Sequence, residues 1–342
     1  MTSLPPLSRD EISRYSRQLL LPEISMIGQQ KLKAASVLIV GVGGLGSPIA
    51  LYLAAAGVGR IGLVDADTVD ISNLQRQIIH TTSSSGTLKV DSAKQRMLEI
   101  NPLIQVDLFP VRFDHTNARQ ISDGYDILVD GTDNIPSRYL LNDLAVLTNR
   151  PYVYGSVYRF EGQVSVFGLP EGPCYRCLFP DPPPPGAIPS CSVAGVLGVL
   201  PGLVGTLQAT EVIKLITGAG KTLLGKLMLL DTMDMSVETV NVRKRMDCPL
   251  CGNSPVIHEL IDYDTWCGIG PDADMGSAGE GLDLEPEQVH QAQQAGKPYL
   301  LLDVRELFEI NLANIPNTLA IPMGEIDNRL AEIPKDIPVV IF

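Results

Sequence analysis

The sequence has no excess of positive charge, no long hydrophobic run and few cysteines, and each lack excludes a class of protein. Its 342 residues carry 26 basic and 39 acidic side chains, a formal charge of −13, which is a poor match for nucleic acid or anionic lipid. The most apolar stretch, residues 193–204, is interrupted by glycine and proline and is shorter than the roughly 20 residues of a membrane span. Six cysteines are too few for a secreted disulfide scaffold, and the first ten residues contain no apolar core of a secretory signal. We therefore expect a cytoplasmic protein that binds neither membrane nor nucleic acid.

The length and composition indicate two folded domains. A hydrophobic content of 45% is enough for a buried core and excludes wholesale disorder, and domains typically span roughly 100–200 residues. Residues 263–283 are rich in glycine, aspartate and alanine and show no periodicity, which is typical of a linker. The expected domains are therefore residues 1–262 and 284–342. The acidity is concentrated in the second part, because residues 1–255 hold 22 basic and 23 acidic side chains, whereas residues 256–342 hold 4 and 16.

Short apolar runs alternate with helical patterns through the first domain. The pattern predicts strands at 37–40, 61–64, 126–129 and 152–154, and helices at 14–33, 49–56, 92–100, 139–147 and 206–216. This rhythm is typical of a doubly wound, Rossmann-like α/β fold with parallel strands. Residues 162–167 and 227–231 predict antiparallel strands, which would make the sheet mixed, and the proline-rich residues 180–189 predict an extended loop.

A glycine-rich loop, GVGGLG at residues 41–46, follows the first strand and opens a helix. Glycines in this context let backbone N–H groups approach a phosphate at the helix N-terminus. Asp65 ends the next strand, where a carboxylate can accept hydrogen bonds from ribose hydroxyls. The motif predicts nucleotide binding but leaves the nucleotide open, and on these features alone an NAD-dependent oxidoreductase is the default interpretation.

The residues that follow Asp65 favour a triphosphate over a dinucleotide. Arg76 and Lys89 are expected at the mouth of the nucleotide crevice, where cations suit the larger charge of ATP. Asp133, in the sequence GTDN that follows another strand, offers a carboxylate to Mg²⁺. Either cation alone would more often be a solvated surface charge, but the combination with strand-end aspartates favours a site for ATP and Mg²⁺.

These ordered motifs resemble the MoeB/ThiF family of ubiquitin-activating-enzyme-like adenylyltransferases. The resemblance rests on GVGGLG, the pair Asp65 and Asp67, SNLQRQ at residues 72–77, the Lys89 segment and GTDN, and it spans residues 9–252. It implies a protein that binds ATP–Mg²⁺ and the C-terminal Gly-Gly of a ubiquitin-like sulfur carrier such as MoaD or ThiS. The carrier carboxylate would attack the α-phosphate and form an acyl-adenylate. Sulfur transfer would then serve molybdopterin, thiamine, cysteine or thiolated tRNA synthesis.

The resemblance also implies roles for individual residues. The nucleotide would be bound by Gly41, Gly43, Gly44, Gly46, Asp65, Asp67, Ser72, Asn73, Leu74, Gln75, Arg76, Lys89, Asp133 and Asn134. Arg76, Lys89 and the Mg²⁺ ligand Asp133 would also be catalytic. Arg17, in RYSRQ at residues 14–18, would reach across a homodimer to the partner's ATP. The sequence alone would favour a simple surface arginine on a helix.

The cysteines fall into two CxxC pairs and two single residues. Cys174 with Cys177 and Cys248 with Cys251 could supply four thiolates to a closed structural Zn²⁺ site. A redox pair is the alternative, but CPLCG resembles a zinc knuckle and the family has the same paired site. Cys191 occupies the position of the family's reactive cysteine, which takes the carrier as a thioester or supports sulfur transfer from a donor such as a cysteine desulfurase. A lone cysteine is more commonly a small buried residue, and Cys267 matches no motif.

The C-terminal part resembles the first half of a rhodanese domain, so the chain is most similar to MoeZ-like MoeB–rhodanese fusions. The resemblance rests on LLLDVRE at residues 300–306 and PVVIF at residues 338–342, while Asn317 replaces the usual glycine of a turn. The chain ends before the position of the rhodanese nucleophile. We therefore expect an incomplete rhodanese-like domain without sulfurtransferase activity of its own.

Two alternatives to a carrier adenylyltransferase differ in class. An NAD-dependent oxidoreductase would need a catalytic histidine or tyrosine, but His80, His115, His258 and His290 form no convincing constellation. A non-catalytic, zinc-stabilised dimer that only docks a carrier would be expected to lack Arg76, Lys89 or Asp133, and all three are present.

Overall fold

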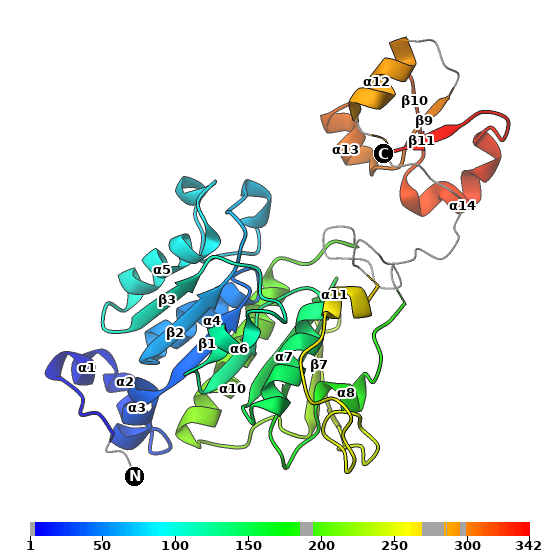
Figure 1. Ribbon diagram of the computed structural model, residues 1–342. Coiled ribbons are helices and arrows are strands. Elements are labelled where there is room, and N and C mark those ends of the chain that lie inside the picture. Colours follow the sequence, from blue (N-terminus) through cyan, green and yellow to red (C-terminus); the bar gives the residue numbers. More distant parts are fainter. Residues whose placement is uncertain (1–3, 185–193, 269–283, 285, 295–298) are drawn as a thin grey trace. The chain divides into compact units, whose positions relative to one another are not determined.

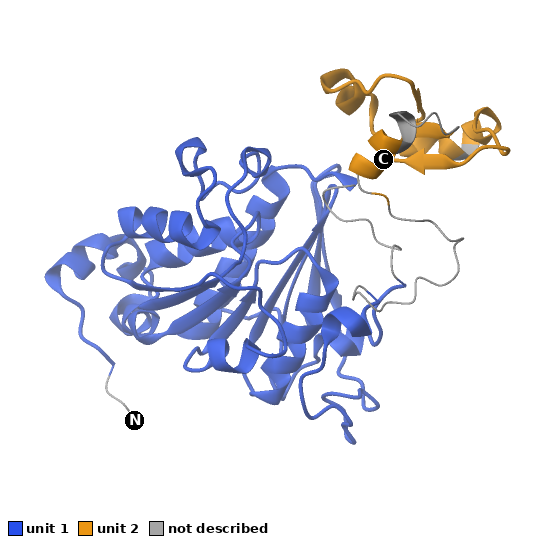
Figure 2. Cartoon of the chain, turned by 45° about the horizontal axis from the view of Figure 1, so that its top comes forward, with its two compact units in different colours: residues 1–274 blue, residues 275–342 orange. Residues whose placement is uncertain are grey.

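The computed structural model describes residues 4–184, 194–268, 284, 286–294 and 299–342. The chain divides into two compact units, residues 1–274 and 275–342 (Figure 2). The domain start at residue 284 remains a prediction, but the expected domain end at residue 262, with a linker from residue 263, differs from the structure. Residues Tyr263–Trp266 form helix α11, and Tyr263 and Cys267 are buried in the core of the first unit. The aromatic side chains of this segment give it a buried face that its lack of periodicity conceals.

A mixed eight-stranded sheet forms the centre of the first unit (Figure 1). The strand order is β3-β2-β1-β4-β5-β6-β7-β8. The strands are β1 (Ser36–Val40), β2 (Arg60–Val64), β3 (Gln105–Phe109), β4 (Ile127–Asp130), β5 (Tyr152–Tyr158), β6 (Glu161–Phe167), β7 (Lys226–Asp231) and β8 (Ser236–Asn241). In this order, neighbouring strands from β3 to β5 pair in parallel, and neighbouring strands from β5 to β8 pair antiparallel. This confirms the predicted Rossmann-like mixed sheet.

Helices cover both faces of this sheet. They are α1 (Arg9–Arg14), α2 (Ser16–Leu19), α3 (Ser25–Ala34), α4 (Gly46–Ala56), α5 (Lys89–Ile100), α6 (Ala118–Ser122), α7 (Ile135–Leu147), α8 (Tyr175–Leu178), α10 (Val199–Thr217) and α11. Because successive strand side chains point to opposite faces, Val37 and Ile39 of β1 pack with α4, α5 and α10. Leu38 and Val40 pack with α6 and α7 on the other face.

The single helix predicted at residues 14–33 is not formed, because α1 ends at Arg14 and α2 and α3 follow as separate short helices. Pro22 lies between α2 and α3 and has no backbone N–H to donate. Ser25 adopts a left-handed φ of +53°, which no residue inside a regular helix adopts. The break therefore follows from local backbone chemistry at Pro22 and Ser25.

Helix α10 is long and apolar enough to cross a membrane by length and composition alone, with a mean hydropathy of 1.3. Core helices of soluble proteins pass the same test, and α10 packs against α4, β5 and β6. It also buries the polar side chains of Gln208 and Glu211, each with hydrogen-bond partners in the core. These contacts identify α10 as a core helix of the first unit.

The second unit contains a three-stranded parallel sheet in the order β10-β9-β11. The strands are β9 (Leu300–Asp303), β10 (Thr318–Ala320) and β11 (Val339–Ile341). Its helices are α12 (Pro286–Gln294), α13 (Leu307–Leu312) and α14 (Ile326–Arg329). Short 3-10 turns lie at Ile71–Asn73 and Thr82–Ser84 in the first unit, and at Met323–Glu325 and Leu330–Glu332 in the second unit. A small second α/β unit in this part of the chain agrees with the expectation from sequence.

Candidate functional site

A cavity of about 330 Å³ opens at the carboxyl ends of the parallel strands, lined by segments that follow β1, β2, β3 and β4. β1 pairs with β2 from Ser36 opposite Arg60 to Val40 opposite Val64. Both strands therefore end at the same level, beside the cavity. The chain continues from β1 into α4 on one face and from β4 into α7 on the other. Ligands of open α/β sheets bind in the crevice that such a reversal creates.

The glycine loop is shaped by contacts that exclude larger side chains. Gly41 has a φ of +89°, and a Cβ there would lie 2.6 Å from the Gly131 carbonyl group. A Cβ at Gly46 would lie 2.0 Å from the Gly41 oxygen. Gly41, Gly43 and Gly44 line the cavity, and Gly46 does not. The missing Cβ of Gly46 lets the first residue of α4 lie close to the Gly41 carbonyl group. The helix N-terminus is thereby left open to an anion.

Asp65 and His80 hold this loop from two sides. The Val42 N–H donates to Asp65 Oδ2 at 2.8 Å, and the Val42 carbonyl lies 3.1 Å from His80 Nε2. Burial raises the pKa of Asp65, with Lys89 opposing that rise, and burial lowers the pKa of His80. Asp65 Oδ1 accepts from the Asp67 N–H at 2.9 Å. Since each carboxylate oxygen has a second lone pair, Asp65 can still accept hydrogen bonds from a ribose.

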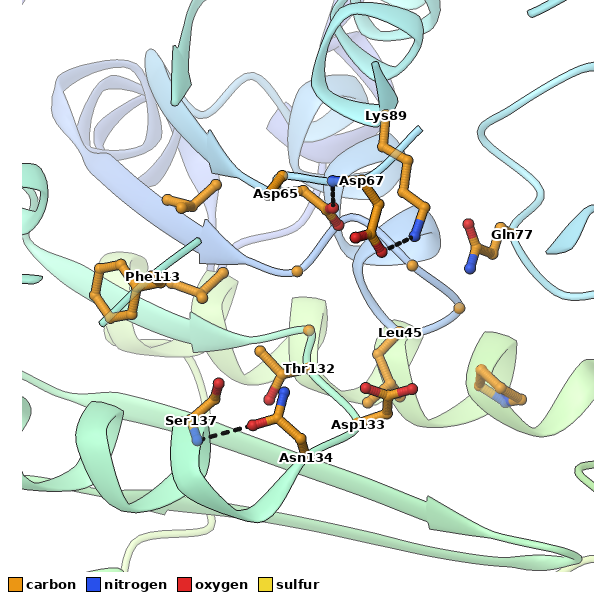
Figure 3. A pocket seen from close by; sticks show the side chains of 18 of the residues that line it. Leu45, Asp65, Asp67, Gln77, Lys89, Phe113, Thr132, Asp133, Asn134 and Ser137 are labelled. Carbon is orange, nitrogen blue, oxygen red and sulfur yellow. Dashed lines mark hydrogen bonds and ion pairs between the residues drawn. The ribbon is translucent and has the colours of Figure 1, made fainter. Parts of the chain in front are cut away.

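Lys89 and Asp67 form an ion pair at the cavity, with Lys89 Nζ 2.7 Å from Asp67 Oδ2. The Lys89 side chain is only 7% exposed, whereas that of Asp67 is 70% exposed. The Lys89 N–H also donates to the Asp67 carbonyl at 2.9 Å, so the start of α5 is fixed to the end of β2. This arrangement holds a nearly buried ammonium group in the cavity wall (Figure 3).

Arg76 lines the cavity, whereas the four residues before it do not. Ser72, Asn73, Leu74 and Gln75 form a turn that starts in a 3-10 helix capped by the Asp70 side chain. The Arg76 guanidinium donates to the Ser72 carbonyl at 3.2 Å, and the turn packs against Gly198 through Gln75. The turn therefore orients Arg76, and direct contacts of its other residues with a nucleotide remain a prediction.

The loop after β4 contributes Asp133 and Asn134 to the cavity. Asn134 caps α7 by accepting from the Ser137 N–H at 3.0 Å (Figure 3). Buried Asp130 anchors the loop, because it accepts from the Thr132 N–H at 2.9 Å and from the Tyr152 hydroxyl at 2.7 Å. Among the residues that the structure describes, no hydrogen bond or ion pair engages the exposed Asp133 carboxylate. Its oxygens are therefore available to a hard cation such as Mg²⁺.

One predicted catalytic residue does not line this cavity, and another lies outside the described residues. Arg17 is exposed on α2 and does not line it. Cys191 lies outside the described residues, as do residues 185–189 of the predicted loop at residues 180–189. Their roles remain predictions.

The cavity is also lined by residues that were not among the predicted nucleotide-binding residues, some of them inside the quoted motifs. They are Val40, Leu45, Val64, Ala66, Gln77, Val111, Arg112, Phe113, Gly131, Thr132, Ser137, Val157, Val196 and Pro201. Figure 3 shows Phe113 at one end of the cavity and Lys89 with Gln77 at the other, with Asp65 between them. Gln77 belongs to SNLQRQ and could have been found from that motif. Residues 111–113 follow β3, a strand that the sequence pattern did not predict, so no signal pointed to them.

The four cysteines of the two CxxC pairs come together although 74 residues separate them. The sulfur atoms lie 3.9 Å apart for Cys174 and Cys177, 3.6 Å for Cys174 and Cys248, and 3.4 Å for Cys177 and Cys251. All four lie within 4.8 Å of one another and are free thiols. Sulfur atoms around a tetrahedral zinc with bonds of about 2.3 Å would be about 3.8 Å apart. The cluster therefore fits a metal ion of that kind.

Comparisons with known proteins agree with this geometry. The ThiF family model matches residues 15–250. The probable adenylyltransferase/sulfurtransferase MoeZ of Mycobacterium tuberculosis is 46% identical over 354 residues, covering 100% of this chain and 88% of the relative. The sulfur carrier protein adenylyltransferase of Thermus thermophilus is 50% identical over 267 residues, covering 77% and 98%. Among solved structures, E. coli MccB with MccA-N7isoASN is similar with a TM-score of 0.64 and 25% identity, covering 70% of this chain and 75% of that chain.

Proposed function

The chain belongs to the ThiF family, and from this premise we propose that it adenylates the C-terminal Gly-Gly of a ubiquitin-like sulfur carrier protein with ATP. The observation that supports this most is one cavity with an apolar end at Val111 and Phe113 and a cationic end at Arg76 and Lys89. A relative named as an adenylyltransferase/sulfurtransferase and one named as a sulfur carrier protein adenylyltransferase favour this function over an NAD-dependent oxidoreductase or a non-catalytic carrier-docking dimer.

The cavity suggests how ATP lies in it. The purine would contact Val111 and Phe113, and the ribose hydroxyls would donate to Asp65. The triphosphate would reach the α4 N-terminus at Gly43 and Gly44, where backbone N–H groups and the helix dipole favour anions. This order follows the positions of Phe113, Asp65 and Lys89 in Figure 3.

Both reactants are anions, so positioning and charge neutralisation are the main requirements of the reaction. A carboxylate oxygen of the carrier's last glycine attacks the α-phosphorus, and the bond from that phosphorus to the bridging oxygen breaks. Pyrophosphate leaves with the electron pair, and the carrier becomes an acyl-adenylate. Arg76 and Lys89 would neutralise the phosphate oxygens, with Lys89 exchanging Asp67 for phosphate. Mg²⁺ held by Asp133 would neutralise the leaving pyrophosphate.

Further parts of the function rest on the family resemblance. We propose that the four-cysteine cluster holds structural Zn²⁺, because its sulfur distances fit tetrahedral coordination. Cys191 would accept the activated carrier as a thioester or assist sulfur delivery from a donor such as a cysteine desulfurase. The second unit would be the first half of a rhodanese-like domain, and the protein would act in the cytoplasm.

Carrier-dependent exchange between ATP and pyrophosphate tests the proposed function directly. With Mg²⁺ present, labelled pyrophosphate should enter ATP only when a carrier ending in Gly-Gly is added, because the acyl-adenylate must form reversibly. A carrier lacking its last glycine is the matched control. An absence of exchange with MoaD-like and ThiS-like carriers alike would contradict the proposal.

We further propose that the protein works as a homodimer in which Arg17 completes the partner's site, since Arg17 is exposed and does not line its own cavity. Arg17→Ala should reduce exchange by about 100–1000-fold, as expected for the loss of one group that stabilises charge in the transition state. Mixing equal amounts of Arg17→Ala and Asp133→Ala chains should restore about a quarter of wild-type exchange, because half the dimers are mixed and each has one intact site. Mixing that restores nothing would show that Arg17 acts within its own chain or not at all.

A further inference from the structure

The residues after the second CxxC pair fold back onto α7, the helix that begins at the nucleotide cavity. The buried Tyr263 hydroxyl donates to Asp143 of α7 at 2.8 Å. The Trp266 ring meets the Tyr139 ring edge-on, with centroids 4.9 Å apart. Helix α11 is thus attached to α7 by buried contacts.

A buried ion pair strengthens this attachment. Arg176 of α8 donates to both Asp143 oxygens, at 2.8 Å and 2.7 Å. Its guanidinium also lies 4.4 Å from the centroid of the Trp266 ring. Helices α7, α8 and α11 therefore share one network, and the position of α11 is fixed relative to the cavity.

This attachment places Asp264 beside Arg112, which lines the nucleotide cavity. One terminal nitrogen of Arg112 donates to both Asp264 oxygens at 2.7 Å. The backbone of Asp264 is fixed by the Asp262 cap of α11, at 3.0 Å. The Arg112 carbonyl accepts from the Asn117 side chain at 2.7 Å. Both members of the pair are therefore held by their own segments, 152 residues apart in the chain.

From this geometry we infer that Asp264 is a positioning residue that holds the Arg112 guanidinium against the base of the bound nucleotide. The inference rests on the proposed ATP site. Arg112 lies between Val111 and Phe113 at the apolar end of the cavity, and a planar guanidinium stacks on aromatic rings. Asp264 takes hydrogen bonds from one edge of the guanidinium, which leaves the flat face of the group free for the purine.

The pair is better suited to binding a ligand than to stabilising the fold. Arg112 is 70% exposed and Asp264 is 28% exposed, and exposed ion pairs contribute little to folding. Without Asp264, the long Arg112 side chain would sample many rotamers. Nucleotide binding would then have to offset the conformational entropy lost when this side chain becomes ordered. The effect of the pair should therefore appear in nucleotide affinity.

The test compares ATP with inorganic triphosphate, which has the phosphates but no base. Asp264→Asn should weaken ATP binding about threefold to fivefold, measured by calorimetry with Mg²⁺, and should leave inorganic triphosphate binding unchanged. Arg112→Ala should weaken ATP binding at least as much, and Arg112→Lys should resemble it because the ammonium keeps the charge but not the plane. The double variant should bind ATP like Arg112→Ala alone, because Asp264 acts through Arg112.

The matched control is Glu99→Gln, which removes the exposed ion pair between Glu99 and Arg96 in the first unit. This variant should bind ATP and inorganic triphosphate normally. In the exchange reaction, Asp264→Asn should raise KM for ATP without lowering kcat. Equal losses for ATP and triphosphate would show that Arg112 acts only as a distant charge, and unchanged ATP binding would overturn the inference while the proposed function stands. A wild-type chain that binds no ATP would instead overturn the proposed function and this inference together.

Discussion

Asp133→Ala is expected to reduce carrier-dependent exchange between ATP and pyrophosphate by about a thousandfold or more, since a lost metal contact removes several kcal/mol of charge stabilisation. Asp133 lines the cavity, and its carboxylate has no ion-pair partner among the described residues. Nothing in the fold around it depends on that carboxylate, so the loss should appear in catalysis and leave the melting temperature unchanged. Exchange measured over a range of Mg²⁺ concentrations, with a melting curve for each variant, checks this expectation.

Two further variants make this result specific. Asp123→Ala removes another exposed aspartate, which follows α6 and precedes β4. Asp123 lies at the opposite end of the strands from the cavity, so this variant should retain full exchange. Cys191→Ala should retain most of the exchange because thioester formation follows adenylation, but it should lose the thioester with the carrier. If Cys191→Ala abolished exchange and Asp133→Ala did not, the assigned roles would be reversed.

Cys248→Ser is expected to empty the four-cysteine site and release the segment around it. Structural zinc sites of this type contribute about 10–16 kcal/mol of apparent binding energy near pH 7, and a serine hydroxyl is a poor substitute for a thiolate. The cysteines pack with one another and with Leu250 in a small separate cluster, with Val146, Leu147 and Ile257 against it, so residues around 248–252 are held by few contacts outside this cluster. Zinc content should fall from about one ion per chain to nearly none, and this segment should become sensitive to protease.

The half of the site on α8 should remain folded in this variant. Arg176 stays paired with Asp143, and the Tyr175 N–H donates to Asn142 at 2.7 Å, so α8 is held independently of a metal. Cys267→Ser is the matched control, because Cys267 is also buried but belongs to the main core. Its zinc content should be normal. A Cys248→Ser chain with a full complement of zinc would rule out the tetrahedral site.

Local chain chemistry made much of the fold predictable from sequence. The buried strands β1, β2 and β4 are nearly uniform apolar runs, and the glycine loop requires residues without a Cβ at Gly41 and Gly46. Strand β8 could not be found this way, because all six of its residues are exposed and no alternation marks a buried face. Strand β3 lies at the other edge of the sheet and is only partly buried. The loop after β3, which supplies the apolar end of the cavity, was missed with it.

The sequence by itself determined the nucleotide loop, the strand-end carboxylates Asp65 and Asp133, and the cysteine pairs, because each depends on residue types at fixed local spacing. The family resemblance already predicted that the two cysteine pairs come together, and the structure confirms this. Only the tertiary structure decided that Arg112 pairs with Asp264 and that residues 263–268 are not part of the linker. Such contacts depend on packing between segments more than 70 residues apart, where no local periodicity or spacing carries information about the partner.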